Sequence, residues 1–366
     1  MHMRACLASF VSLVLFAWTR PLWAAPMDPA IERLIDPSTA GCRTDSGAIA
    51  LPSDGSDYIP CKPDHAAFRR LVAQYAFALA PTAMHSATTT GIGGFHVSLE
   101  AAYTDIDQSA EYWKLGTRGA IDPSTNEASV INETPQGVLQ LYSARLRKSF
   151  GYGFEIAAQT GFMPKTSLWS TGADVRLSLF EGFRRGIPGK IPDLAVGGGV
   201  RTVTGTPEFQ LTIASMDVVL SKPFAINDAV VVTPFVGYQY LWIFADSNVV
   251  DFTPATDEET LCNYDGQALP GQTNAESTDQ YTGSALCGPG GNSIDLENNR
   301  VFQRARMQRQ RLLFGAEVRH ESLLLGTELI VDFVRPSDAQ RSDFNKAALS
   351  GMPRQWTAVL DLGLMF

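Results

Sequence analysis

The side chains after residue 25 that are best suited to acid–base catalysis are the histidines His65, His85, His96 and His320. A surface hydrolase uses such a residue as a base beside a nucleophile or an activated water. Neither G-x-S-x-G nor H-E-x-x-H occurs in the sequence, and no histidine falls in a long predicted loop. We therefore expect no enzyme and no cofactor, and a hydrolase with a site built from carboxylates alone stays as the weaker alternative.

The segment 245–299 is rich in carboxylates and contains no Lys or Arg. Carboxylates bind Ca²⁺, but this segment lacks the spacing of a calcium loop, and the cysteines lack the spacing of a zinc site. We interpret the segment as a solvated acidic loop and predict no metal site, with binding of divalent cations as the alternative. Its acidic residues are Asp246, Asp251, Asp257, Glu258, Glu259, Asp265, Glu276, Asp279, Asp295 and Glu297.

Strands must position most of the charged side chains, because from residue 94 onward apolar residues recur at every second position. The run "FHVSLEAAYT" at 95–104 and the last residues "TAVLDLGLMF" are clear examples. Their length suits a strand that crosses a membrane, about 9 to 11 residues, better than a soluble strand of about 5 or 6. Ten such runs are predicted, at 95–104, 138–149, 154–162, 168–180, 194–204, 210–221, 229–243, 301–319, 323–334 and 355–366.

The connections between these runs alternate in length. The long ones, 105–137, 244–300 and 335–354, all follow odd-numbered strands, whereas outer-membrane barrels have short periplasmic turns and long external loops. We predict an all-β fold: a closed antiparallel up-and-down transmembrane β-barrel of about ten strands, with twelve as the alternative, over residues 94–366. A soluble secreted β-protein is the competing interpretation.

The two faces of the predicted strands differ in kind. Charged residues of both signs fall on the inward face, where they either pair in a filled interior or line a polar passage. These lumen charges are Glu100, Arg145, Arg147, Glu155, Asp174, Arg176, Arg201, Asp217, Arg309, Arg311, Glu317, Glu328, Asp332 and Asp361. The outward face is aliphatic between two belts of aromatics typical of membrane interfaces, namely Phe95, Phe154 and Phe366 at one end and Tyr103, Phe162, Trp169, Tyr240, Trp242, Phe333 and Trp356 at the other.

The last strand, "WTAVLDLGLMF" with its terminal Phe366, resembles the C-terminal signature of bacterial outer-membrane β-barrel proteins. The resemblance is to the class, through general features of residues 94–366. It implies a location in the outer membrane of a Gram-negative bacterium, reached through the periplasm, and recognition of this strand by the barrel-assembly machinery. Outer-membrane lipid and lipopolysaccharide would be the surroundings.

The N-terminal part of the chain precedes the alternating pattern. Residues 1–24 have the arginine, apolar run and small residues of a secretory signal peptide, with an uncleaved anchor as the alternative. Residues 25–93 are predicted as a periplasmic extension or cap. It contains one helix at 64–80, for which Asp64 is the N-cap and Pro81 the stop. This extension could hang in the periplasm, cover the lower mouth or enter the lumen, and we favour the cap because charged side chains leave little room inside.

Four cysteines remain after the signal, and an exported chain with an even number is expected to form disulfides. Three pairings are open, and we favour Cys42–Cys61 and Cys262–Cys287 because the two couples lie on opposite sides of the predicted barrel. The second bridge would clamp the acidic loop.

Two classes of function stay open for the predicted barrel. A net charge of −9 argues against nucleic acid as a partner. The barrel is expected to be either a narrow channel for a small solute or a closed structural barrel, with a surface-interaction, adhesin-like barrel carrying the acidic loop as the alternative. The solute, the partner and the oligomeric state do not follow from the sequence.

Overall fold

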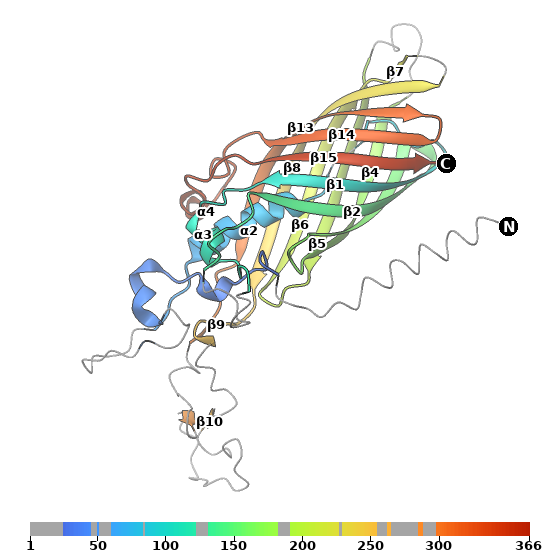
Figure 1. Cartoon of the computed structure of the whole chain (residues 1–366). Coiled ribbons are helices and arrows are strands. Elements are labelled where there is room, and N and C mark those ends of the chain that lie inside the picture. The colour runs from blue at the N-terminus through green and yellow to red at the C-terminus, as the bar shows by residue number, and fades with distance from the viewer. Residues whose placement is uncertain are drawn as a thin grey trace, which may run out of the picture.

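The structure is a computed structural model, and it describes residues 25–44, 50, 60–82, 85–121, 131–181, 191–226, 229–254, 262–264, 285–287 and 298–366. The predicted signal peptide and most of the acidic loop lie outside these residues. Within the described part, long strands form one closed antiparallel sheet (Figure 1).

The sheet has eleven strands, and β7 (Phe224–Ala225) is a short addition that pairs only with β8. The other strands close into a barrel, because β13 pairs with both β14 and β8. They are β1 (Phe95–Asp105), β2 (Val138–Ser149), β3 (Phe154–Phe162), β4 (Trp169–Phe180), β5 (Asp193–Thr204), β6 (Phe209–Ser221), β8 (Val230–Ser247), β13 (Ala305–His320), β14 (Leu323–Asp332) and β15 (Trp356–Met365). The predicted ten-stranded antiparallel barrel is confirmed, and the twelve-stranded alternative is wrong.

The last residue takes part in closing the barrel. Strand β15 pairs with β1 so that Val97 lies opposite Leu364. At the end of this seam the backbones of Phe95 and Phe366 exchange two hydrogen bonds, of 2.9 and 2.8 Å. Closure leaves no unpaired edge, which a barrel in hydrocarbon requires.

The two ends of the barrel differ. At one end, called here the short-turn end, the strands are joined by residues 150–153, which include the turn η3 (Gly151–Gly153), and by 181–192, 222–229 and 321–322. The opposite end, called the long-loop end, carries the helices α3 (Glu111–Leu115) and α4 (Asp343–Ala348) and the short strand pairs β9 (Val250–Asp251) with β12 (Asn299–Arg300) and β10 (Cys262–Tyr264) with β11 (Ala285–Cys287). Figure 1 shows the C-terminus at the short-turn end and these helices at the other.

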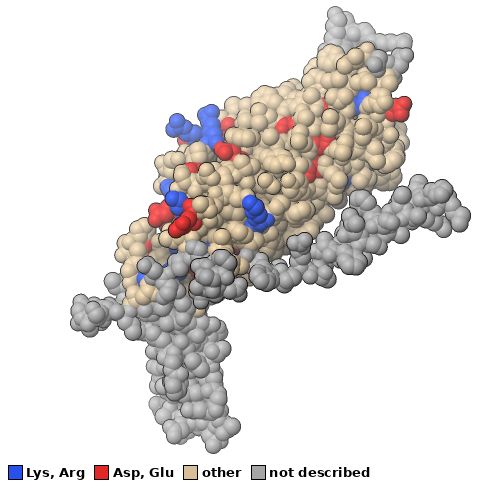
Figure 2. Space-filling model, in the orientation of Figure 1, with Lys and Arg blue, Asp and Glu red and all other residues tan. Residues whose placement is uncertain are grey.

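The outward face of the barrel is apolar. Leu99, Leu329 and Leu362 are 58%, 44% and 53% exposed, although each lies in the middle of a paired strand. Figure 2 shows the wall of the barrel mostly without charged side chains. All ten predicted interface aromatics lie on this face, partly or largely exposed. No helix among the described residues is long and apolar enough to cross a membrane.

The N-terminal segment lies against and inside the barrel. Two 3-10 turns, η1 (Ile31–Arg33) and η2 (Pro37–Cys42), lead to the helix α2 (His65–Leu79). The Asp64 carboxylate accepts hydrogen bonds of 2.9 Å from the backbone amides of Ala66 and Ala67 and so begins the helix. This helix lies inside the barrel at the long-loop end (Figure 1). The structure therefore differs from the expected cap over the opposite mouth.

Candidate functional site in the barrel lumen

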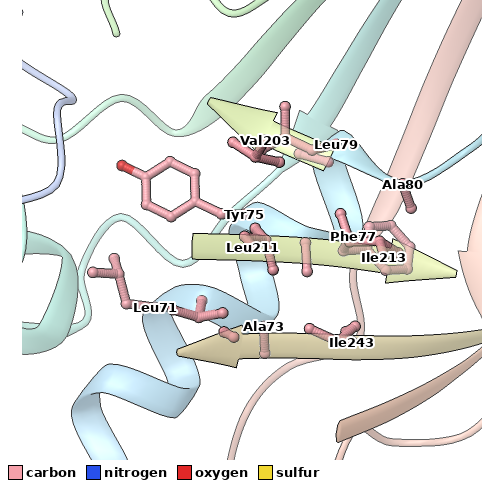
Figure 3. Close-up of a cluster of buried hydrophobic side chains, with 14 of the residues drawn as sticks. Leu71, Ala73, Tyr75, Phe77, Leu79, Ala80, Val203, Leu211, Ile213 and Ile243 are labelled. Atoms are coloured by element: carbon pink, nitrogen blue, oxygen red, sulfur yellow. The ribbon is translucent and has the colours of Figure 1, made fainter. Parts of the chain in front are cut away.

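The upper lumen, next to the long-loop end, is lined by apolar side chains that hold α2. Figure 3 shows Tyr75, Phe77 and Leu79 of the helix packed against inward residues of β5, β6 and β8. These wall residues are Val203, Leu211, Ile213 and Ile243, each at most 5% exposed. The helix is thus surrounded on most sides, which is typical of a buried helix rather than a surface one.

The lower end of α2 rests on two arginines of β13. The Phe77 ring lies 4.7 Å from the Arg309 guanidinium and 5.1 Å from that of Arg311, so both can make cation–π contacts with it. Arg311 also donates to the carbonyl oxygens of Phe77 and Pro81, at 3.2 and 2.6 Å. The carbonyls at the end of a helix lack partners within the helix, and here Arg311 supplies one.

Below the helix, residues 80–82 and 85–94 continue through the lower lumen outside any helix or strand. Arg145 donates to the carbonyl of Thr82 at 3.2 Å, and Arg176 donates to the carbonyls of His85 and Ser86 at 3.2 and 3.1 Å. The Glu317 carboxylate accepts from the Ser86 amide at 2.8 Å. The wall therefore contacts this stretch largely through its main chain.

The same stretch leaves the barrel at the short-turn end. The Thr89 amide donates to Glu181 at 2.9 Å, the Thr90 amide donates to the Ser149 hydroxyl at 3.0 Å, and the Gly93 amide donates to the Ser149 carbonyl at 3.3 Å. Strand β1 then starts at Phe95. Residues 65–82 and 85–94, called here the lumen segment, thus have contacts from one end of the barrel to the other.

Most of the remaining charges of the wall pair with one another, whereas Glu328 and Asp361 form no ion pair among the described residues. All fourteen predicted lumen charges lie inside, and the most accessible, Asp174, has a side chain only 13% exposed. Arg145 and Arg201 both bind Asp174, at 2.9 and 2.8 Å. The other ion pairs are Arg145–Glu100 at 3.2 Å, Arg147–Glu155 at 2.9 Å, Arg176–Asp217 at 3.8 Å and Arg309–Asp332. Glu317 lies within hydrogen-bond distance of the His85 ring, at 3.2 Å.

Little space remains between the lumen segment and the wall. A cavity of about 20 Å³ lies beside Pro81, Thr82, Arg145 and Asp174, which is room for about one water molecule. In the described part of the lumen, the side chains and the lumen segment fill the interior. The arrangement can hold a polypeptide main chain.

Two of the four histidines are buried in the lumen, and the other two lie toward the ends of the barrel. His85 and His96 lie in the lower lumen, 2% and 0% exposed. His65 packs edge-on against Phe302 at the long-loop end, and His320 is the last residue of β13 at the short-turn end. The described residues contain no group of three side chains arranged to hold a metal ion.

The lumen segment is tied to the long-loop end by polar contacts of α2. Trp113 of α3 donates to the Gln74 side chain at 2.7 Å, and Gln74 in turn donates to the Tyr112 hydroxyl at 2.7 Å. The Tyr75 hydroxyl donates to the carbonyl of Met27 at 2.6 Å. The helix therefore fixes both the first long loop and the N-terminal residues over the mouth.

An ion pair and a disulfide complete this end. Arg118 donates to Glu208 at 3.2 Å, and burial raises the pKa of the Glu208 carboxyl to about 7, with the nearby Glu32 adding to the effect. The predicted disulfide Cys42–Cys61 is present. The backbone register places Cys262 opposite Cys287, but their side chains and the rest of the acidic loop lie outside the described residues, so that bridge and cation binding stay predictions.

Comparisons with known proteins give similarity of form only. No protein-family model matches the sequence, and no curated protein matches it. Similar solved structures include Ail, the attachment invasion locus protein of Yersinia pestis, with a TM-score of 0.23 and 9% identity over 75% of this chain and 100% of that chain. The KdgM porin in complex with disordered oligogalacturonate has a TM-score of 0.27 and 5% identity over 74% of this chain and 99% of that chain. The outer membrane protein OprG of Pseudomonas aeruginosa has a TM-score of 0.26 and 10% identity over 77% of this chain and 99% of that chain. It belongs to the class that the C-terminal strand of this chain resembles.

Proposed function

We propose that the protein is an integral β-barrel of the outer membrane of a Gram-negative bacterium and that its lumen is closed by its own N-terminal segment. The short-turn end faces the periplasm and the long-loop end faces outward, as in outer-membrane barrels generally. In this proposal the protein is a structural or surface-interaction barrel rather than a channel, and it has no catalytic role.

The outward face supports a lipid environment. Large side chains such as Leu99, Leu325 and Leu360 are each at least 50% exposed, and contiguous apolar surface of this extent is not stable in water. The aromatics Phe95, Phe154 and Phe366 lie at the short-turn end, and seven others lie toward the long-loop end. Outer-membrane lipid and lipopolysaccharide are therefore proposed as the surroundings, and the barrel-assembly machinery is proposed to recognise β15.

The observation that carries the closed-barrel proposal is the course of the lumen segment from end to end. Its helix occupies the apolar upper lumen, and the described residues between Ala80 and Thr90 occupy the charged lower lumen. A solute channel needs a continuous aqueous path, and the cavity beside Pro81 has room for about one water molecule.

Surface interaction is the second function that a specific observation favours. The long-loop end is built from the disulfide-linked N-terminal residues, α3, α4 and α2, joined by contacts such as Trp113 to Gln74 and Tyr75 to Met27. Such a fixed surface outside the membrane is suited to binding a partner, for example in adhesion.

Planar-bilayer recordings of the folded full-length protein test the proposal. We expect no steady unitary current from the full chain and steady currents from a variant that lacks residues 26–90. Heat-modifiable migration of both proteins on gels provides the control for folding. Steady currents from the full-length protein would overturn the closed barrel and restore the channel.

A further inference from the structure

We propose that the barrel holds its own N-terminal segment across the outer membrane, so that residues 25–63 are displayed on the cell surface. The C-terminus and the start of β1 stay on the periplasmic side. This inference rests on the proposed function for the location and orientation of the barrel, and it adds the side on which the N-terminal residues lie.

The described residues of the N-terminal part bind the long-loop end. The Met27 amide donates to the carbonyl of Lys165 at 3.0 Å, and the Asp28 carboxylate accepts from the Ser167 amide at 2.5 Å. Lys165 and Ser167 belong to the connection between β3 and β4 at the long-loop end. Arg43 donates to the carbonyl of Phe252, which follows β9 at the same end, at 3.1 Å.

Further along the chain, the end of the lumen segment binds the short-turn end. Gly93 and Gly94 are hydrogen-bonded to the backbone of Ser149, the last residue of β2. Between these two anchor regions the barrel wall is continuous, because each barrel strand pairs with a neighbour on both sides. The chain therefore reaches one end from the other through the lumen and not through the wall.

The side chains of the barrel wall bind main-chain groups of the lumen segment. Four arginines of the wall donate to main-chain carbonyls of the lumen segment: Arg309 to Ala73 at 3.4 Å, Arg311 to Phe77 and Pro81, Arg145 to Thr82, and Arg176 to His85 and Ser86. Seryl hydroxyls repeat the pattern, since Ser178 donates to the carbonyl of Ala87 at 2.7 Å and Ser221 accepts from the Ala87 amide at 2.8 Å. Carbonyls and amides are common to every polypeptide, so the ligand class of this lumen is a peptide chain.

Loss of the hydrogen bonds between the wall arginines and the lumen segment would be unfavourable, because these arginines are buried. Arg309 and Arg311 are 0% and 1% exposed, and a buried guanidinium needs both a counter-charge and acceptors for its N–H groups. Asp332 neutralises Arg309, and the carbonyls of the lumen segment accept remaining hydrogens of both arginines. Without a main chain in the lumen these donors would lose partners, so the wall is matched to a resident peptide.

Cysteine labelling in whole cells tests the display of residues 25–63. The probes are Ser38→Cys in the N-terminal segment and Ile92→Cys at the other end of the lumen segment, where Ile92 is 88% exposed. The orientation references are Ser109→Cys at the long-loop end and Tyr152→Cys at the short-turn end; Ser38 and Ser109 are exposed, and Tyr152 is 101% exposed. A membrane-impermeant maleimide carrying polyethylene glycol reports labelling as a gel shift, before and after the outer membrane is permeabilised.

We expect Ser38→Cys and Ser109→Cys to be labelled in intact cells, and Ile92→Cys and Tyr152→Cys to be labelled only after permeabilisation. Labelling of Ser109→Cys with protection of Ser38→Cys would overturn the display while leaving the outer-membrane barrel intact. Labelling of Ile92→Cys together with Ser109→Cys would overturn it as well. Intact-cell labelling of Tyr152→Cys with protection of Ser109→Cys, or absence of the protein from outer-membrane fractions, would instead overturn the proposed function.

Discussion

The substitution Phe77→Ala removes the side chain that joins α2 to the arginines of the wall. The Phe77 ring is 1% exposed and lies within 5.1 Å of the guanidinium groups of Arg309 and Arg311. It also belongs to the apolar cluster of the upper lumen (Figure 3). Alanine leaves a cavity there, and the barrel wall, held by its own backbone hydrogen bonds, can collapse little to fill it.

The expected loss follows from two contributions. A buried Phe→Ala change costs about 3–5 kcal/mol, and each partly desolvated cation–π contact adds about 0.5–2 kcal/mol. At about 1.4 kcal/mol for each factor of ten, the lower bound of about 3 kcal/mol shifts the ratio of displaced to docked lumen segment by on the order of 100-fold. The barrel itself should persist, since Phe77 lies in none of its strands.

Single-channel recording measures this ratio as the fraction of time in a conducting state. We expect brief openings to be on the order of 100-fold more frequent for Phe77→Ala than for the unchanged chain. Phe244→Ala is the matched control, because Phe244 is 40% exposed on the outward face and has its own cationic neighbour, Arg306, at 5.5 Å. If folded Phe77→Ala stayed as silent as the control, the helix would not be what closes the lumen.

Three further predictions concern other parts of the molecule. The Cys42–Cys61 bridge spans 19 residues, so its reduction should destabilise the N-terminal segment by about 3 kcal/mol, measured as faster protease cleavage within 25–63; an unchanged rate would contradict this. Because the pKa of Glu208 is raised from 4.5 to about 7, the folded state binds more protons between these values and its stability falls as pH rises through this window. The melting temperature at pH 8 should therefore be lower than at pH 5, and Glu208→Gln should flatten the difference. Leu362→Arg should lower barrel stability by about 2–4 kcal/mol in lipid, measured by urea titration in vesicles; no loss would argue that this face does not meet hydrocarbon.

The barrel was predictable because a two-residue period depends only on the neighbours of each residue along the chain. Val97, Leu99 and Leu362 alternate with Glu100 and Asp361 within their own strands, and the structure places the two sets on opposite faces. Strand ends were displaced by only a few residues, except that β8 extends to Ser247 and β13 starts at Ala305. The strand count followed because each strand is long enough to be recognised alone.

The pairing of lumen charges could not be predicted in the same way. Arg145 binds both Glu100 and Asp174, residues of β1 and β4 that are far apart in sequence. Which acid pairs with which base depends on the register between neighbouring strands. The two-residue period of a single strand does not determine this register. The sequence indicated only that acids and bases faced inward in similar numbers.

The position of the helix was mispredicted, although the chain contained a signal for it. Phe68, Leu71, Val72, Tyr75 and Leu79 mark one apolar face and predict the helix, whereas the cap was favoured because charged side chains leave little room in the lumen. From Leu71 to Ala80, however, the only polar side chain capable of strong hydrogen bonding besides the Tyr75 hydroxyl is Gln74, so the second half of the helix is apolar on nearly every side, and such a helix is buried. The structure leaves residues 71–79 buried throughout, and it satisfies Gln74 with Trp113 and Tyr112.

The sequence of the barrel wall also indicated a buried helix at the long-loop end. Leu241, Ile243 and Ala245 of β8 are apolar where the inward face should be polar, and their outward neighbours Trp242 and Phe244 are apolar too. A strand that is apolar on both faces is buried on both, so at the long-loop end something other than water had to fill the barrel. Below this region Gln239 of β8 and Arg311 of β13 begin the polar part of the lumen, and there the helix ends at Leu79 with Ala80 in an extended conformation. An extended chain offers its carbonyls and amides to the wall, whereas a helix uses most of them internally. The change in conformation therefore follows the change in the lining, and this correspondence is the strongest physical reason to regard barrel and lumen segment as one folded unit.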